Sequence, residues 1–354
     1  MGELRLDGHK LMYHVPRLYQ WYKGENIYPI YIEIGLHGGC NHRCIFCAFD
    51  FLKYKPQALD VKCLNKFIIE AARKKVKAVL FSGEGEPLLH NHVAEIISFT
   101  KNKGIDVALS TNGIMLGKER SDKILGYLTW IRVSVNAGTK KGYAFIHGTK
   151  KEDFNKVINN LKVAVKIKNR RKYKCTIGVQ FLLMPQNYKE VLKLASILKS
   201  IGVDYLVVKP YSQHPSSKNK FSFRLKSIEL YRLQEQLMKY SNNNFKIIFR
   251  NKAIKKMEED KPYKYCLGLP FATHIASDGS IYPCNTFVGN KKFKFGNICD
   301  ESFKNIWEGR KRKDIMKMIY NKWDIKECRK SCRIDEINRY LWELKNPGKH
   351  INFI

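Results

Sequence analysis

Short β-rich runs alternate with helical runs from residue 30 onward. Strands are expected near 30–36, 77–82, 106–111, 130–136, 176–183 and 204–209. Helices are expected near 60–74, 92–103, 119–126, 152–168 and 188–201. Parallel strands need a helix-length crossover between them, so this alternation predicts an α/β fold built on a parallel sheet.

Several of the expected strands alternate apolar and polar residues, which places the polar side chains on one face. The polar positions are Glu33, Arg132, Ser134, Asn136, Thr176, Gly178 and Gln180. A closed eight-stranded barrel fills its interior with branched apolar side chains. We therefore expect an open, partial (β/α)6 TIM-like barrel whose lumen holds a polar ligand. An antiparallel sheet with these residues in solvent is less favoured, because the strand–helix alternation requires helices on the outer face.

The chain is long enough for one large domain and a smaller one. We expect an N-terminal extension at 1–29, the barrel at 30–215, a linker and bridging helix at 216–262, a small module at 263–332, and a C-terminal helix and tail at 333–354. In the small module, Asp278-Gly279 marks the tight turn of a β-hairpin.

The sequence contains ten cysteines, and their oxidation state depends on the cellular compartment of the protein. No run approaches the ~20 apolar residues of a membrane span, and the acids Glu3 and Asp7 stand where a signal peptide would need apolar residues. We therefore expect a cytoplasmic protein whose cysteines are reduced and bind metal. Cys63 and Cys175 occupy ordinary element positions, which favours a packing role for both.

The formal charge of +33 arises from 65 basic and 32 acidic residues spread along the chain. Such a field attracts nucleic acid, phosphorylated small molecules or an acidic carrier. A compositional bias toward Lys, Asn and Ile would give the same charge without any function, so both interpretations stay open. Basic runs such as 168–172 lack the interleaved aromatic residues that single-strand binders use, which makes nucleic acid the less favoured partner.

Three cysteines, Cys40, Cys44 and Cys47, lie on one short loop after the first strand. Thiolates hold the four irons of a cubane iron–sulfur cluster, so three of them leave one iron open. A structural zinc site would need a fourth ligand at short spacing, and His42 is the one candidate within the loop. The cluster interpretation is favoured.

The spacing Cys-x3-Cys-x2-Cys, with Phe46 before the last cysteine, resembles the signature of the radical S-adenosylmethionine (SAM) superfamily. The resemblance implies that the open iron of a [4Fe–4S] cluster chelates the amine and carboxylate of SAM. One electron, supplied by a flavodoxin- or ferredoxin-type donor, then gives methionine and a 5′-deoxyadenosyl radical that removes hydrogen from the substrate. Phe46 takes the position of the family's adenine neighbour.

Further stretches resemble the family's SAM contacts. The segment Gly83-Glu84-Gly85-Glu86 is similar to the family's Gly-Gly-Glu-Pro stretch, with Glu84 as a departure between the glycines. The resemblance implies that this segment receives the SAM amino group. The ribose and carboxylate contacts would map onto Ser110, Asn112, Ser134 and Asn136, with Gln180 as a weaker candidate.

The end of the sixth strand carries Lys209, Tyr211 and His214. They could bind a phosphate or carboxylate, or pass a proton or hydrogen atom to the substrate. A lysine on an inward strand position needs an anionic partner. A histidine in a polar loop is more often structural or exposed.

A second set of cysteines, Cys266, Cys284, Cys328 and Cys332, would fully ligate one further cluster. A four-cysteine zinc knot has a similar spacing. The surrounding residues resemble the auxiliary [4Fe–4S] module of radical SAM enzymes, in its short Twitch/SPASM-like form. Cys299 is an extra cysteine that could be a spare thiol, an alternative ligand or a hydrogen-atom donor.

The sequence thus predicts a radical SAM oxidoreductase or lyase with two [4Fe–4S] clusters. The basic, polar lumen favours a small anionic sugar derivative, such as a nucleotide sugar, undergoing dehydrogenation, epimerisation or decarboxylation. A peptide-modifying maturase is the second hypothesis. A non-catalytic protein that binds metal and nucleic acid is the third, and RNA recognition would require a compact basic face.

Overall fold

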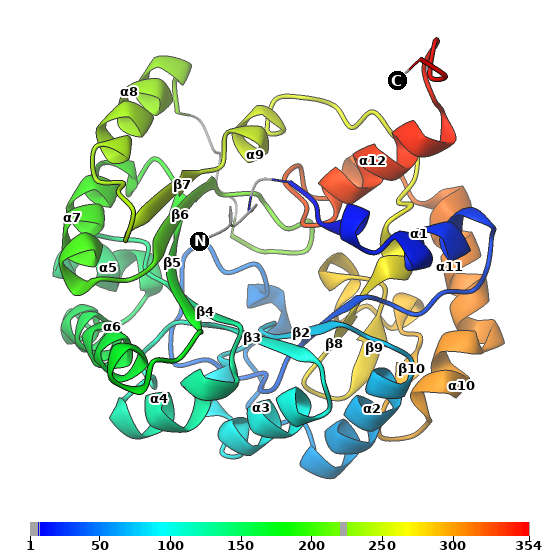
Figure 1. The fold of residues 1–354 in the computed structure, drawn as a ribbon, viewed down its shortest axis with the longest axis horizontal. Helices are drawn as coiled ribbons and strands as arrows, with labels where there is room; N and C mark the ends of the chain where they lie inside the picture. The colour runs from blue at the N-terminus through cyan, green and yellow to red at the C-terminus, as the bar shows by residue number, and fades with distance from the viewer. Residues whose placement is uncertain (1–5, 7, 220–224, 354) are drawn as a thin grey trace.

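The computed structural model describes residues 6, 8–219 and 225–353 and contains one ten-stranded sheet. Along the sheet the strand order is β10-β9-β8-β1-β2-β3-β4-β5-β6-β7. The parallel strands after the N-terminal segment are β1 (Tyr31–Ile34), β2 (Ala78–Phe81), β3 (Asp106–Thr111), β4 (Trp130–Ser134), β5 (Thr176–Leu183), β6 (Tyr205–Pro210) and β7 (Lys246–Phe249). They curve around a central lumen with helices outside, as in a partial TIM-like barrel (Figure 1).

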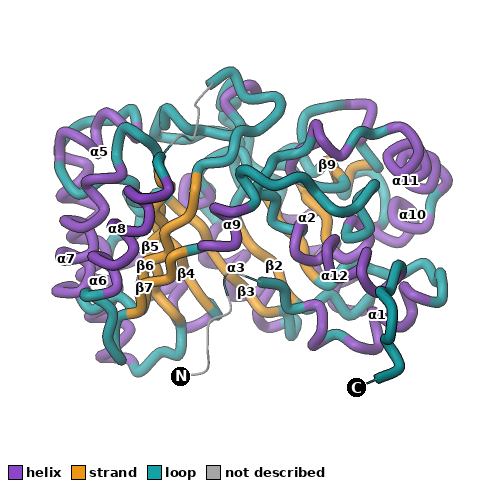
Figure 2. Tube along the Cα trace, turned by 90° about the horizontal axis from the view of Figure 1, so that it is seen from above, coloured by secondary structure: helices purple, strands orange, loops and turns teal. Residues whose placement is uncertain are grey.

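The crossover helices cover the outer face of the sheet, as the view from above shows (Figure 2). They are α2 (Val61–Arg73), α3 (Val93–Asn102), α4 (Lys118–Ile124), α5 (Lys140–His147), α6 (Glu152–Arg171), α7 (Val191–Ile201), α8 (Ser227–Met238) and the short α9 (Asn251–Lys255). All six predicted strands are present. The seventh strand, β7, was not predicted and lies within 216–262, where we expected only a linker and a helix.

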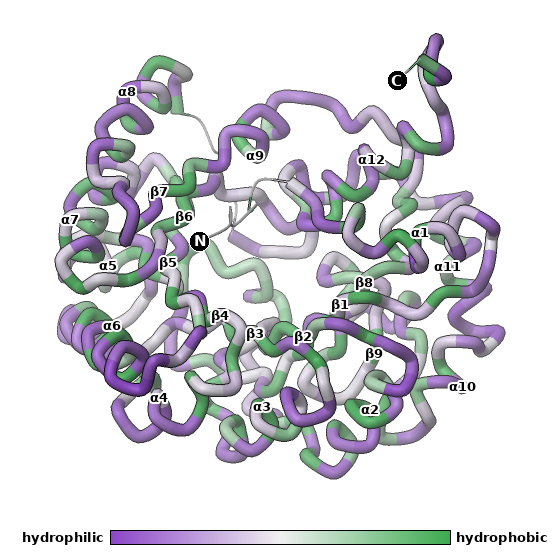
Figure 3. The backbone as a smooth tube through the Cα atoms, in the orientation of Figure 1, coloured by the Kyte–Doolittle hydropathy of each residue, from purple (hydrophilic) through white to green (hydrophobic). Residues whose placement is uncertain are grey.

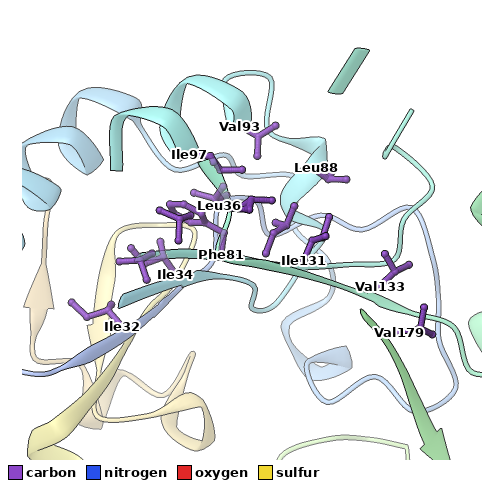
Figure 4. Close-up of a cluster of buried hydrophobic side chains, with 14 of the residues drawn as sticks. Ile32, Ile34, Leu36, Phe81, Leu88, Val93, Ile97, Ile131, Val133 and Val179 are labelled. Carbon is purple, nitrogen blue, oxygen red and sulfur yellow. The ribbon is translucent and has the colours of Figure 1, made fainter. Parts of the chain in front are cut away.

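The core lies between the strands and these helices. Ile34 of β1, Phe81 of β2 and Ile131 of β4 point toward Val93 and Ile97 of α3 (Figure 4). Each of these side chains is almost fully buried, and burying one aliphatic or aromatic side chain stabilises a fold by about 1.5–3 kcal/mol. Because side chains alternate along a strand, the polar residues between them face the lumen. Hydrophobic stretches lie on strands of the sheet, whereas hydrophilic stretches lie on the outer helices (Figure 3).

The C-terminal module continues the same sheet. It contains β8 (Ala272–Ile275), β9 (Ser280–Tyr282) and β10 (Gly296–Asn297), followed by α10 (Phe303–Glu308), α11 (Arg310–Lys322) and α12 (Asp335–Lys345). Strand β8 pairs in parallel with β1, on the edge opposite to β2. The predicted hairpin is confirmed, since β8 and β9 are antiparallel and Gly279 takes a left-handed φ of +81° in the turn.

The first helix, α1, and the last helix, α12, pack together on one side of the barrel. Leu18 and Trp21 of α1 (Val15–Tyr22) form a buried cluster with Leu341 of α12. The bounds of the five predicted regions stay a prediction, and residues 1–5, 7, 220–224 and 354 of those regions lie outside the described residues. Among the helices of the described chain, none is both long and apolar enough to cross a membrane.

Candidate active site

A cavity of about 500 Å³ lies at the carboxyl ends of the strands. One wall is the cysteine loop, a second comes from the ends of β2 to β6, and a third comes from residues 329 and 331–333 of the C-terminal module. Sites of barrel and open-sheet proteins usually lie at this edge, because the loops that leave the strands converge there. The sequence places polar residues on all three walls.

The three loop cysteines, Cys40, Cys44 and Cys47, all line this cavity. The loop is compact, since the Cys47 amide donates to the Cys44 carbonyl at 3.0 Å. It is also held to α5, where the Ile45 amide donates to the Ile146 carbonyl at 3.1 Å. Burial raises the pKa of Cys40 to about 11 and raises that of Cys44 well above its usual value. Buried thiolates need a compensating cation, so the donor set fits a metal cluster.

The zinc alternative is less well supported by the geometry. Ligand atoms of His42, Cys44 and His147 lie within 4.8 Å of one another. The His147 Nε2 atom, however, already accepts a hydrogen bond from the Asn136 amide at 3.1 Å. The His42 Nε2 atom lies 3.6 Å from a carboxylate oxygen of Asp153. A zinc ion held by these three residues would also leave Cys40 and Cys47 without a role.

His147 is a functional candidate that the sequence analysis missed. Burial lowers its pKa well below the usual value, so the ring is neutral. Because Nε2 accepts the Asn136 amide proton, the ring proton must lie on Nδ1. Nδ1 is 3.4 Å from the Cys44 sulfur and therefore donates to it. The tautomer of His147 is thus fixed by its second hydrogen bond.

The glycine-rich segment after β2 lines the cavity through Gly83, Gly85 and Glu86. A Cβ atom at Gly85 would lie 2.1 Å from the His37 carbonyl oxygen, so only glycine fits there. The Glu86 carboxylate accepts from the Thr111 hydroxyl at 2.6 Å and from the Asn112 amide at 2.8 Å. Burial raises the Glu86 pKa despite these bonds. These hydrogen bonds fix the Glu86 side chain in the cavity wall, and Glu86 also lines the cavity.

Two of the predicted SAM contacts are placed away from the cavity lining. Glu84 is buried, accepts a hydrogen bond from the Ser277 amide at 2.5 Å and lies 3.5 Å from His274 of β8. It joins the glycine-rich segment to the C-terminal hairpin. The Asn136 carboxamide oxygen accepts from the Leu182 amide at 2.6 Å and so links the ends of β4 and β5. The Asn136 oxygen and one Glu84 oxygen therefore form structural hydrogen bonds, and the second Glu84 oxygen lies beside His274.

The remaining predicted SAM contacts are brought together. Phe46, Ser110, Asn112, Ser134 and Gln180 all line the cavity. Asn112 donates from Nδ2 to Asn41 on the cysteine loop at 2.6 Å, which ties β3 to that loop. The Gln180 Oε1 atom is buried and has no hydrogen-bond partner among the described residues. A polar ligand in the cavity would satisfy it.

The four predicted catalytic residues separate into two pairs. Lys209 and Tyr211 line the cavity. His214 is buried beside it, donates from Nε2 to the Asn285 carbonyl at 3.2 Å and accepts the Ser216 amide at Nδ1. Burial lowers the His214 pKa to about 4, and the ring stacks on Phe51. This environment is that of a structural histidine.

The fourth candidate, Cys299, is exposed and does not belong to the cavity lining. Its thiol lies in the turn region near Gly279 and close to Cys63 at the start of α2. The hydrogen-atom donor role would require a thiol at the cavity. The structure therefore places Cys299 away from the cavity, where a hydrogen-atom donor would have to lie.

The second cysteine set is assembled at the edge of the cavity. The charges of Cys332, Cys284 and Cys328 all act on the Cys266 thiol, so the four sulfurs are neighbours. Two further side chains donate to these sulfurs. Asn338 Nδ2 lies 3.2 Å from Cys266 and Trp323 Nε1 lies 3.2 Å from Cys328. Such donors stabilise thiolates, so the site fits an iron–sulfur cluster.

Four cavity-lining arginines were not among the predicted site residues. They are Arg132 on β4, Arg250 after β7, and Arg329 and Arg333 beside the auxiliary cysteines. The alternation of β4 had placed Arg132 on the lumen face. The other three carry no such signal, because only the fold brings residues 250, 329 and 333 to the same cavity. Arg333 pairs with Glu33 of β1 at 2.9 Å.

Comparisons with known proteins agree with this geometry. The profile of the radical SAM superfamily matches residues 34–205, and that of the SPASM iron–sulfur cluster-binding domain matches residues 266–333. The cofactor-modifying protein for the tungsten-containing aldehyde ferredoxin oxidoreductase of Pyrococcus furiosus is 23% identical over 301 residues, 78% of this chain and 80% of that protein. The AdoMet-dependent heme synthase of Methanosarcina barkeri is 24% identical over 301 residues, 79% and 82% of the two chains.

Solved structures share the fold. SuiB of Streptococcus suis bound to S-adenosylmethionine superposes with a TM-score of 0.65 at 19% identity, covering 85% of this chain and 70% of SuiB. The protein anSMEcpe with bound AdoMet gives a TM-score of 0.59 at 19% identity, covering 88% of each chain.

The first match accounts for the open cysteine loop, with its [4Fe–4S] cluster and SAM, and the second accounts for the auxiliary cysteines. The chain belongs to the radical SAM superfamily of enzymes and carries a C-terminal SPASM iron–sulfur domain.

Proposed function

We propose that this enzyme removes a hydrogen atom from a polar, anionic carbohydrate or nucleotide-sugar substrate, leading to dehydrogenation, epimerisation or decarboxylation. One observation carries the proposal: the three-cysteine loop and a group of cationic side chains line the same cavity. The chemistry that the cluster and SAM supply when bound is reductive cleavage of SAM and hydrogen abstraction by the resulting adenosyl radical.

The residues that line the cavity have two proposed roles. We assign Phe46, Gly85, Ser110 and Ser134 to SAM. We assign Lys209 and the arginines to the substrate. The Nε atom of Arg132 is buried without a hydrogen-bond partner among the described residues, and leaving such a donor unbonded is costly, so an anionic substrate group would be drawn to these cations. Its hydroxyl groups could bond the unpartnered Gln180 oxygen.

A peptide substrate is the second candidate. It is favoured by the structural resemblance to SuiB, one structure of which is described as bound to the precursor peptide SuiA, with a TM-score of 0.64 at 18% identity. The cations of the cavity would then bind acidic side chains of the peptide. We also propose an acidic flavodoxin- or ferredoxin-type electron donor, since a charge of +33 favours encounter with such a partner.

The test is anaerobic reconstitution followed by dithionite reduction in the presence of SAM. We expect about eight irons per chain for two cubane clusters, and formation of 5′-deoxyadenosine. The variant Cys44→Ser should abolish this product, whereas Cys175→Ser, at a buried position outside both cysteine sets, should retain it. Zinc in place of iron, with no SAM cleavage, would instead favour the non-catalytic hypothesis.

Substrate class is tested with deuterated compounds. Sugar phosphates and nucleotide sugars labelled on the sugar ring should transfer deuterium into 5′-deoxyadenosine if the proposal is right. Transfer from an acidic peptide but from no sugar would favour the second candidate.

A further inference from the structure

Five cationic side chains converge in the lumen from elements that are distant in the sequence. They are Arg132 of β4, Lys209 of β6, Arg250 after β7, and Arg329 and Arg333 of the loop 328–333. Burial lowers the pKa of Lys209 well below its usual value, and the charges of the four arginines lower it further. The five groups are therefore close enough to repel one another.

Two of these cations already have a compensating negative group. Arg333 pairs with Glu33 at 2.9 Å. Burial alone would raise the Glu33 pKa, but Arg333 holds it below the usual value, so the pair is ionised. Arg329 lies close enough to Cys332 to feel the charge of that sulfur. A metal-bound thiolate there would offset part of the arginine charge.

Arg132 and Lys209 have no carboxylate partner among the described residues. Among the described residues that line the cavity, the one carboxylate is Glu86, which is bonded to Thr111 and Asn112. The Nε atoms of Arg132 and Arg329 are buried without a hydrogen-bond partner among the described residues. Buried guanidinium donors are costly to leave unbonded, and guanidinium geometry matches carboxylate and phosphate oxygens.

The loop 328–333 is held against the segment that follows Lys209. Arg329 donates from Nη2 to the Ser212 carbonyl at 2.7 Å, and the Ser331 amide donates to the Ser212 hydroxyl at 3.1 Å. The same short loop carries the cysteines Cys328 and Cys332 at its two ends. Its conformation is therefore set both by the auxiliary cysteine site and by the end of β6.

We propose that this side of the cavity binds a substrate group with at least two neighbouring negative charges on oxygen, and that the auxiliary loop supplies part of that site through Arg329. A single negative charge would leave Arg132 or Lys209 without a counterion. The inference rests on the proposed function only in taking this cavity as the substrate site. It assigns the C-terminal module a direct role in substrate binding, in addition to holding a cluster.

The test is equilibrium binding to the reconstituted full chain by calorimetry, at constant ionic strength. Inorganic pyrophosphate and the dicarboxylate malonate are the dianionic or higher probes, and acetate is the monoanionic probe. Pyrophosphate should bind at least tenfold more tightly than acetate. Preference between pyrophosphate and malonate then distinguishes a phosphate-bearing substrate from a polycarboxylate.

Matched variants locate the site. Arg329→Gln should weaken pyrophosphate binding by tenfold or more, the usual worth of a hydrogen bond to a charged group. Lys330→Gln removes the same charge from the next residue, whose exposed side chain instead contacts Asp260 and the Glu259 carbonyl, and should change binding by less than twofold. Arg132→Gln should weaken binding as Arg329→Gln does. Because Arg132 is far from the cysteines in the sequence, this variant should keep the iron content of the wild type.

Two results would overturn the inference: pyrophosphate binding no tighter than acetate, or an equal loss in the Arg329 and Lys330 variants. Cleavage of SAM without substrate is measured on the same samples. If SAM is cleaved while pyrophosphate binding is insensitive to Arg329 and Arg132, this inference fails and the proposed radical chemistry stands. If pyrophosphate binds as expected but SAM is not cleaved, this inference stands and the proposed radical chemistry fails.

Discussion

At the scale of single residues, His147 connects the cysteine loop to β4. Its Nδ1–H donates to Cys44, because the Asn136 amide occupies Nε2. A donor to a cluster sulfur stabilises the more negative, reduced state and raises the reduction potential. One hydrogen bond of about 1 kcal/mol corresponds to ~40 mV for one electron. We expect His147→Phe to lower the potential of this cluster by roughly that amount, measured by an EPR-monitored redox titration.

The control keeps a donor near the same sulfur. His147→Gln can still present an N–H group, so its potential should lie between those of the wild type and the phenylalanine variant. Equal potentials in all three proteins, at equal iron content, would show that His147 only fills space. A change in the auxiliary cluster alone would also contradict the assignment.

Lys209 should make the binding of a polyanion depend on pH, and the surroundings of Lys209 determine the direction of that dependence. Burial and the charges of Arg132, Arg250, Arg329 and Arg333 lower its pKa well below the usual value. A bound polyanion would raise that pKa again, so binding should take up protons and strengthen as the pH falls. We expect pyrophosphate binding near pH 8 to take up as much as about one more proton in the wild type than in Lys209→Gln. Calorimetry in buffers of different ionisation enthalpy measures this difference.

At the scale of elements, Glu84 joins two parts of the sheet. Its carboxylate accepts the Ser277 amide and lies beside His274 of β8. Although burial would raise it, the Glu84 pKa is held below the usual value by His274 and Ser277. Removing this carboxylate leaves the buried Ser277 amide without its acceptor, which costs about 1–3 kcal/mol. Glu84→Ala should therefore lower the denaturant midpoint of unfolding strongly.

Affinity for SAM separates this structural role from the contact that the sequence predicted for Glu84. The milder variant Glu84→Gln keeps an acceptor for Ser277, so it should unfold between the wild type and Glu84→Ala. Its SAM affinity, measured by equilibrium dialysis, should change by less than about threefold if Glu84 only braces the sheet. A large loss of SAM binding with an unchanged midpoint would favour the direct contact.

Local signals were sufficient for the first six strands, for both cysteine sets and for many of the cavity residues. Periodic alternation placed Arg132, Ser134 and Gln180 on the lumen face, because that pattern depends only on neighbouring residues. The strand β7 was missed, since Lys246–Phe249 is short and lies in a polar segment. Arg250 and Arg329 could not be predicted, because their approach to Lys209 depends on pairings between strands far apart in the sequence.

At the scale of the whole molecule, the two matched domains share one sheet. Strand β1 pairs with β2 on one side and with β8 on the other, so the C-terminal module supplies a neighbour to the first barrel strand. A chain that ends at residue 262 would leave an edge of β1 unpaired and uncover the core beside it. Unpaired edges with apolar side chains promote aggregation. We therefore expect this truncated chain to be insoluble or aggregated, as judged by size-exclusion chromatography and circular dichroism.

The strand and the auxiliary metal site make separate contributions to this result. In Cys266→Ser/Cys284→Ser the strand β8 is present but two auxiliary cysteines are removed. Because pairing of β8 with β1 uses backbone hydrogen bonds, this variant should remain folded with about half the iron of the wild type. If the double variant aggregates as the truncated chain does, the module is held to the barrel by its metal site. A monomeric, folded truncated chain would show instead that the barrel does not need the added strand.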